Sequence, residues 1–295
     1  MKARAPLSHQ VPLVIRNLRP WGEREAHDLA VMNGRFLAVT PHMTAERTID
    51  AEGRLAIPGF IDPHIHLDKV LIAESVRPNK SGTLTEAIEI IWDRKRNYSV
   101  DEIATRASQV IESAISNGVT HIRTHVDVDT IGGLTPLRGV ALARSRYQDY
   151  IDIQIVAFPQ EGILRDPGAE ALMWEAMDAG ADLVGGMPFN EKSYADSVRH
   201  IEIAFEIARK FHADIDMHVD ETDDPRARTL EVLADKTIEN GWQGRVTAGH
   251  TCALAGYSDE SPIQQQTSCF KGAETISRFV AVSRACKNFS STMST

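Results

Sequence analysis

Two histidines separated by one residue, His64 and His66, are the side chains of this sequence with the clearest capacity for chemistry. Side chains two residues apart on a β-strand leave the same face, so the two imidazoles would project together. Imidazole suits zinc or iron, and His or carboxylate ligands from elsewhere would complete such a site. A bare His-x-His pattern also occurs in strands that bind no metal, so the rest of the chain must decide between the two interpretations.

Three further segments end apolar runs with side chains suited to the same chemistry. They are Phe-Pro-Gln-Glu-Gly at 158–162, Met-His-Val-Asp-Glu at 217–221 and Ala-Gly-His-Thr at 248–251. The Gln160 amide offers one acceptor and two donors, which could bind an amide or a pyrimidine edge. Taken singly, each residue could be an ordinary loop or core side chain. The ordered set is what indicates an active site.

The elements that must position these residues follow from the periodicity of the apolar residues. Helices are expected at 82–98, 101–117, 137–146, 169–179, 194–211 and 225–240, and strands at 120–128, 151–158, 182–186, 214–219 and 246–250. Such alternation with short connections predicts a parallel sheet, and a long run of it predicts a TIM barrel. The active site of that fold lies at the carboxyl ends of the strands, which is where the four segments fall.

The domain organisation is predicted from the same pattern. Residues 1–57 contain short strands and an Asn33-Gly34 hairpin signal, which indicate a small N-terminal β-sandwich portion. Residues 58–257 supply about six strands of a TIM-barrel-like (β/α)8 fold. Residues 258–295 form an atypical polar tail with one candidate helix near 275–285, so we expect an incomplete barrel.

Composition limits the classes of partner. The chain of 295 residues has 32 basic and 41 acidic residues, a net charge of −9, which disfavours nucleic acid and anionic membranes. It has neither a signal-peptide pattern nor an apolar run long enough to span a bilayer, so we expect a cytoplasmic protein. Cys252, Cys269 and Cys286 are expected to be free thiols. A small-molecule substrate is the expected partner, and homo-oligomerisation stays open.

The stretch Pro-His-Ile-His-Leu-Asp at 63–68 resembles the first-strand signature of the amidohydrolase superfamily, and within it the cytosine deaminase branch. The 158–162 segment resembles, without a gap, the segment of that branch whose glutamine binds the base. The resemblance extends over about residues 10–257. It implies a metal-dependent hydrolase with a (β/α)8 barrel.

The resemblance also implies roles for particular residues. One divalent metal ion, zinc or iron, would be bound by His64, His66 and His218, with Glu221 as proton shuttle, His250 orienting water or substrate and Gln160 binding the base. The implied reaction is hydrolytic deamination of a free nucleobase or related cyclic amidine, in which metal hydroxide attacks and ammonia departs. His125 and Asp127 would support this site.

Two departures from the family pattern bear on this interpretation. The segment 182–187 has no lysine to bridge two metals, which favours a single ion, and no residue stands in a recognisable strand-eight context to supply the expected metal-binding aspartate. A cyclic amide or amine hydrolase of the same superfamily and a truncated inactive barrel therefore remain as alternatives. The sequence does not choose among cytosine, isoguanine, creatinine and a pterin.

Overall fold

The computed structural model describes residues 9–258, which belong to two compact units, Met1–Gly59 and Phe60–Thr295. The predicted polar tail and its candidate helix lie outside the described residues, apart from Ser258. None of the helices within residues 9–258 is long and apolar enough to cross a membrane.

The first unit is a small sheet. Its strands are β1 (His9–Pro20), β2 (His27–Met32), β3 (Arg35–Ala38), β4 (Met43–Asp50) and β5 (Leu55–Ala56). The sheet order is β3-β2-β1-β4, with β5 also paired to β1. Asn33 and Gly34 have φ angles of 52° and 71°, so the β2–β3 hairpin turns where both central residues need positive φ.

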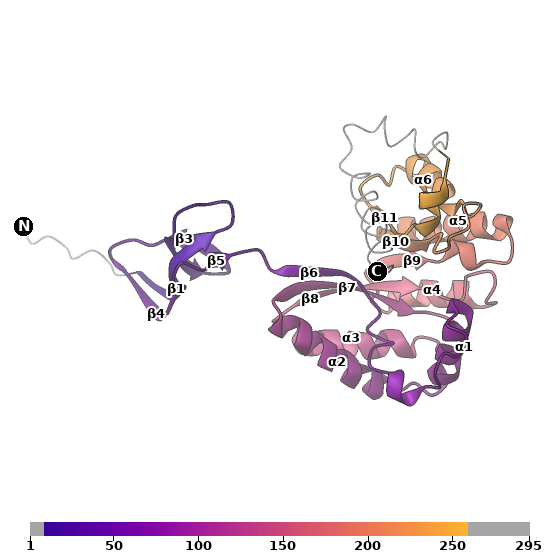
Figure 1. The fold of residues 1–295 in the computed structure, drawn as a ribbon, viewed down its shortest axis with the longest axis horizontal. Coiled ribbons are helices and arrows are strands. Elements are labelled where there is room, and N and C mark those ends of the chain that lie inside the picture. The colour runs from indigo at the N-terminus through magenta and orange to yellow at the C-terminus, as the bar shows by residue number, and fades with distance from the viewer. Residues whose placement is uncertain (1–8, 259–295) are drawn as a thin grey trace, which may run out of the picture. The chain divides into compact units, whose positions relative to one another are not determined.

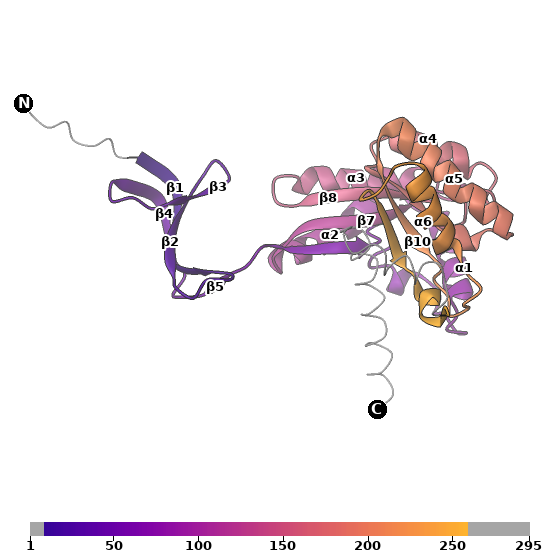
Figure 2. The same cartoon turned by 90° about the horizontal axis from the view of Figure 1, so that it is seen from above.

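The second unit contains six parallel strands in the order β11-β10-β9-β8-β7-β6, curled into a half-barrel (Figures 1 and 2). The strands are β6 (Phe60–Ile65), β7 (Val119–Asp127), β8 (Asp152–Phe158), β9 (Leu183–Gly186), β10 (Asp214–Val219) and β11 (Val246–His250). The predicted six-stranded α/β architecture is therefore confirmed.

Helices connect these strands. They are α1 (Leu84–Lys95), α2 (Val100–Ser116), α3 (Thr135–Tyr147), α4 (Ala169–Asp178), α5 (Tyr194–Phe211) and α6 (Thr229–Glu239), with short 3₁₀ turns at Ala73–Ser75, Pro188–Asn190 and Cys252–Gly256. Figure 1 shows α2 and α3 lying together along β7 and β8.

The helix α2 shows how sequence pattern becomes packing. The Ser99 hydroxyl accepts a hydrogen bond from the backbone N–H of Glu102 at 3.3 Å, which caps the first turn. Ile103, Ala107 and Ile111 recur at helical spacing and are fully buried in the core. Burial of this apolar stripe orients the helix and leaves the strand ends free to carry polar side chains.

Candidate active site

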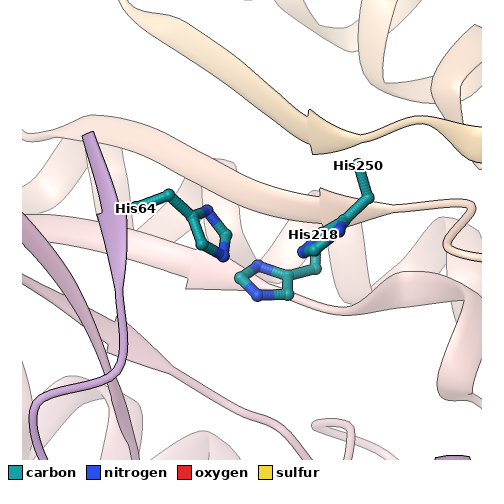
Figure 3. A group of neighbouring side chains, drawn as sticks. All are labelled: His64, His218 and His250. Atoms are coloured by element: carbon teal, nitrogen blue, oxygen red, sulfur yellow. The ribbon is translucent and has the colours of Figure 1, made fainter. Parts of the chain in front are cut away.

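The imidazoles of His64, His218 and His250 converge from three different strands (Figure 3). His64 lies on β6, His218 on β10, and His250 is the last residue of β11. One ring nitrogen from each lies within 4.8 Å of the other two. The ring centroids are 4.7 Å apart for His64 and His218 and 4.4 Å apart for His218 and His250. Three nitrogens at this spacing could bind one metal ion.

His66 lies one residue beyond the end of β6. Its Nδ1 is 3.0 Å from the backbone carbonyl of His125, and only a protonated Nδ1 can donate to that oxygen. The lone pair of His66 is therefore on Nε2, which faces Nε2 of His218 at 3.3 Å. The structure thus brings the three predicted ligands together, and His250, predicted to orient water or substrate, lies in the same cluster.

These histidines favour the neutral form. Burial, together with His125 and His250, lowers the pKa of His64 to about 4. Burial also lowers the pKa of His66, His218 and His250. Within the described chain, Nδ1 of His218 and Nε2 of His250 are buried without a hydrogen-bond partner. Neutral imidazoles with unused nitrogens are the donor set that a divalent cation needs, so the residues fit the implied metal.

Glu221 follows β10 and approaches the histidines. Its Oε1 lies 3.4 Å from Nδ1 of His250. Burial raises the pKa of Glu221, and the nearby Lys69 opposes that rise. The neighbouring Asp220 fixes the chain at Glu221. Its carboxylate accepts hydrogen bonds from the backbone N–H groups of Thr229 and Leu230 at 3.1 and 2.9 Å. A carboxyl group with a raised pKa is therefore fixed beside the imidazoles.

A cavity of about 200 Å³ opens at these strand ends. It is lined by His66, Lys69, Ala87, Ile88, Ile91, Gln160, Glu161, His218, Glu221 and His250. All the predicted site residues except His64 line it. A pocket with an apolar wall on α1 and several convergent polar groups is typical of a small-molecule site.

Gln160, two residues beyond β8, has a partner for each end of its side-chain amide and for its backbone carbonyl. Oε1 accepts a hydrogen bond from Nζ of Lys69 at 3.2 Å, and Nε2 lies 3.1 Å from the sulfur of Met187. Its backbone carbonyl accepts a hydrogen bond from Nδ2 of Asn190 at 2.9 Å. The side chain is therefore held at the wall of the cavity.

Lys69 begins a buried charge network that sequence reasoning did not find. Its Nζ lies 2.5 Å from Oδ1 of Asp127, whose Oδ2 lies 2.7 Å from Nζ of Lys95. Lys95 also contacts Asp129 at 2.5 Å and Glu161 at 3.4 Å, and its side chain is fully buried. Burial alone would lower the pKa of Lys95, but the three carboxylates outweigh it and raise the pKa. Lys95 ends α1, where a basic residue is ordinary, so the sequence offered no signal.

His125 supports the candidate site through a buried contact with Asp216. It is buried on β7, and its Nε2 lies 3.0 Å from Oδ1 of Asp216 on β10. Asp216 also accepts from Nη1 of Arg123 at 2.8 Å. Sequence reasoning missed Asp216, although a signal existed: it stands two residues before His218 and so shares its strand face.

A model described as the amidohydrolase family matches residues 47–269. N-isopropylammelide isopropyl amidohydrolase of Pseudomonas sp. strain ADP is 31% identical, over 86% of this chain and 64% of its own length. The pterin deaminase of Rhizobium rhizogenes is 32% identical, over 77% of this chain and 52% of its own length.

The solved structure of 5-methylcytosine deaminase from Klebsiella pneumoniae, liganded with 5-fluorocytosine, is also similar. Its TM-score is 0.77 at 40% identity, covering 83% of this chain and 60% of that chain. The chain therefore spans about half to two thirds of the length of these relatives.

Proposed function

Because the chain belongs to the amidohydrolase family, we propose that it serves metal-dependent hydrolytic deamination of a free nucleobase or a related cyclic amidine. The observation that carries this proposal is the cluster of four imidazoles, three of which line one small cavity together with Glu221. The similarity to 5-methylcytosine deaminase and pterin deaminase supports the choice of substrate class.

In the proposed site His64, His66 and His218 hold one divalent cation, zinc or iron. When bound, that cation would supply a Lewis acid able to lower the pKa of a water towards about 7. His66 is suited to this role because the carbonyl of His125 holds its Nδ1–H and directs its Nε2 lone pair towards His218. His250, 4.4 Å from His218 between ring centroids, would orient water or substrate.

Glu221 is the proposed proton carrier. Its raised pKa means that it holds a proton at a higher pH than an exposed glutamate. It could therefore protonate a ring nitrogen, take up a proton from the water that adds to the ring, and pass this second proton to the departing amine. In the overall reaction water adds to the ring carbon, the bond from that carbon to the amino nitrogen breaks, and ammonia leaves. The contact of Glu221 with Nδ1 of His250 would keep the carboxyl group near the reacting carbon.

Gln160 and Lys69 are proposed to bind the ring edge opposite the reacting carbon. Lys69 uses two of its contacts on Asp127 and Gln160, which leaves one of its three N–H donors for a substrate oxygen. The Gln160 amide offers its remaining donor and acceptor capacity to a ring amide.

A second candidate is hydrolysis of a ring-substituted amine by the same chemistry. It is favoured by the 31% identity to N-isopropylammelide isopropyl amidohydrolase, whose name describes such a leaving group. The two candidates differ in the group that leaves, so a measurement that detects ammonia and alkylamine separately distinguishes them.

The test is ammonia release from cytosine by the purified chain loaded with zinc or with iron, beside Glu221→Gln. We expect the substitution to lower kcat at least about 100-fold because general acid–base catalysis contributes that much. Metal content, measured by elemental analysis, should be unchanged in the variant. Glu239→Gln, at an exposed position at the end of α6, is the matched control and should keep the parent rate.

Three outcomes would separate the alternatives. Equal ammonia release by the parent and by Glu221→Gln would remove Glu221 from the mechanism. Release of isopropylamine from N-isopropylammelide without deamination of cytosine would favour the second candidate. No product from either substrate, with metal bound, would favour an inactive barrel.

A further inference from the structure

A buried hydrogen bond that the proposed reaction does not use joins α5 to the connection between β9 and α5. Nδ1 of His200, on α5, lies 2.7 Å from Oε1 of Glu191, and neither side chain is exposed. Burying two such groups is costly unless their remaining polar atoms also find partners. The partners that they find are backbone N–H groups of residues 163–165 and of Met187, which lie close to Gln160 in sequence or in space.

Glu191 binds the chain segment that follows Gln160. Its carboxylate accepts hydrogen bonds from the backbone N–H groups of Ile163, Leu164 and Arg165 at 2.6, 3.1 and 2.8 Å. Three backbone donors on one carboxylate fix a loop that has no sheet neighbours of its own. The loop leaving β8 is therefore tied to the β9–α5 connection.

His200 binds the segment that follows β9. Its Nε2 accepts a hydrogen bond from the backbone N–H of Met187 at 3.1 Å, which leaves Nδ1 as the protonated nitrogen facing Glu191. The sulfur of Met187 lies 3.1 Å from Nε2 of Gln160, and Nδ2 of Asn190 donates to the Gln160 carbonyl at 2.9 Å. Both the side chain and the backbone of Gln160 thus rest on residues 187–190.

Two glycines leave room for this arrangement. A Cβ on Gly162 would lie 2.9 Å from Oε1 of Glu191, and Gly162 has a φ of +92°. A Cβ on Gly186 would lie 3.0 Å from Nε2 of His200. Any larger residue would displace the pair, so the local sequence is matched to it.

We propose that Glu191 and His200 are positioning residues that fix the orientation of the Gln160 amide at the cavity wall. The consequence for substrate binding rests on the proposed function. The orientation itself does not, and it can be measured without a substrate.

The test uses the full chain labelled with ¹⁵N-glutamine. The side-chain NH₂ signals of Gln160 are assigned by their disappearance in Gln160→Glu. We expect these signals to shift or broaden in Glu191→Gln. The single amide oxygen of the new side chain cannot accept from all the N–H groups that donate to the Glu191 carboxylate. Glu206→Gln, at a half-buried position of α5 where the carboxylate pairs with Arg199, is the matched control and should leave them in place.

Unchanged Gln160 signals in a folded Glu191→Gln protein would overturn the inference. If that variant does not fold, Asn190→Ala gives the same readout, because the hydrogen bonds of the Asn190 side chain reach the Gln160 carbonyl and the exposed Arg165. Shifted signals in Asn190→Ala support the inference and unchanged signals contradict it.

Kinetics separate this inference from the proposed function. If Gln160 binds the substrate, Glu191→Gln should raise KM for cytosine about tenfold, the value of one hydrogen bond, with a much smaller change in kcat. Shifted Gln160 signals with an unchanged KM would leave the positioning role intact and remove Gln160 from substrate binding.

Discussion

At the scale of single residues, the site combines neutral imidazoles with one carboxylate, Asp127, whose pKa is lowered. Burial disfavours the charged form of every group, and the outcome depends on the neighbours. The histidines face one another, so each lowers the pKa of the next. Asp127 faces Lys69 and Lys95, which overcome the effect of burial and lower its pKa. Neutral imidazoles and a carboxylate with a lowered pKa therefore lie side by side in one buried site.

The lowered pKa of His64 makes stability depend on pH. Between about pH 6.5 and 4 the unfolded chain binds a proton that folded His64 does not, so the free energy of unfolding falls as the pH falls through this range. We expect the urea midpoint of the metal-free protein to decrease from pH 7 to pH 4.5.

His64→Asn should weaken this pH dependence, since asparagine does not titrate. His121→Asn, at an exposed histidine of β7, is the matched control and should retain it. Equal pH dependence in the parent and in His64→Asn would contradict the assignment.

At the scale of elements, α1 is joined to the strand ends by charge, whereas α2 and α3 are joined by close packing. Lys95 extends from the end of α1 to Asp127 and Asp129, at and just beyond the end of β7. Gly139 brings α3 so near to α2 that a Cβ there would lie 2.6 Å from Cβ of Ile103. Each contact predicts the effect of one substitution.

Lys95→Met should destabilise the protein by about 3–5 kcal/mol, because it leaves buried carboxylates without their cation. Lys210→Met, at an exposed position of α5, should change stability by less than about 0.5 kcal/mol. Urea denaturation at pH 7 measures both. A Lys95→Met protein as stable as the parent would show that the carboxylates are solvated or protonated.

Gly139→Ala should also be destabilising, although alanine favours helix by about 1 kcal/mol. The added methyl group overlaps Ile103, and overpacking costs about 1–3 kcal/mol, so we expect a net loss of about 1–2 kcal/mol. Ser145→Ala, exposed on the same helix, serves as the control and should show no such loss. A Gly139→Ala protein that melts above the parent would mean that α2 and α3 separate easily.

At the scale of the whole molecule, the histidines of the candidate site come from strands across the full width of the half-barrel. His64 comes from β6 and His250 from β11, the two outermost strands of the described sheet. Within residues 9–258 each of these strands pairs with a single neighbour, whereas β8 and β9 pair on both sides. Two of the four imidazoles of the candidate site therefore lie on strands that have one hydrogen-bonded neighbour within the described residues.

Hydrogen exchange should reveal this difference. We expect backbone amides of β6 and β11 to exchange faster than those of β8, because strands with one neighbour open at a lower free energy. Saturating zinc should slow exchange in both outer strands if their histidines share an ion. Strong protection of β6 and β11 without metal would mean that residues outside 9–258 cover these edges.

The sequence alone predicted the alternation of strands and helices, the β2–β3 turn and the polar residues at the strand ends. These depend on periodicity, capping and turn chemistry within a few residues. The residues that hold the site could not be predicted in this way. Lys95 and Asp129 are 34 residues apart, His125 and Asp216 are 91 apart, and neither spacing has a local signature.

Only the tertiary structure therefore decided which buried groups pair, which imidazoles lie closest, and that Gln160 rests on the segment held by Glu191 and His200. The physical reason is that charge burial and hydrogen bonding depend on distance in space, whereas the sequence records only the order of the residues.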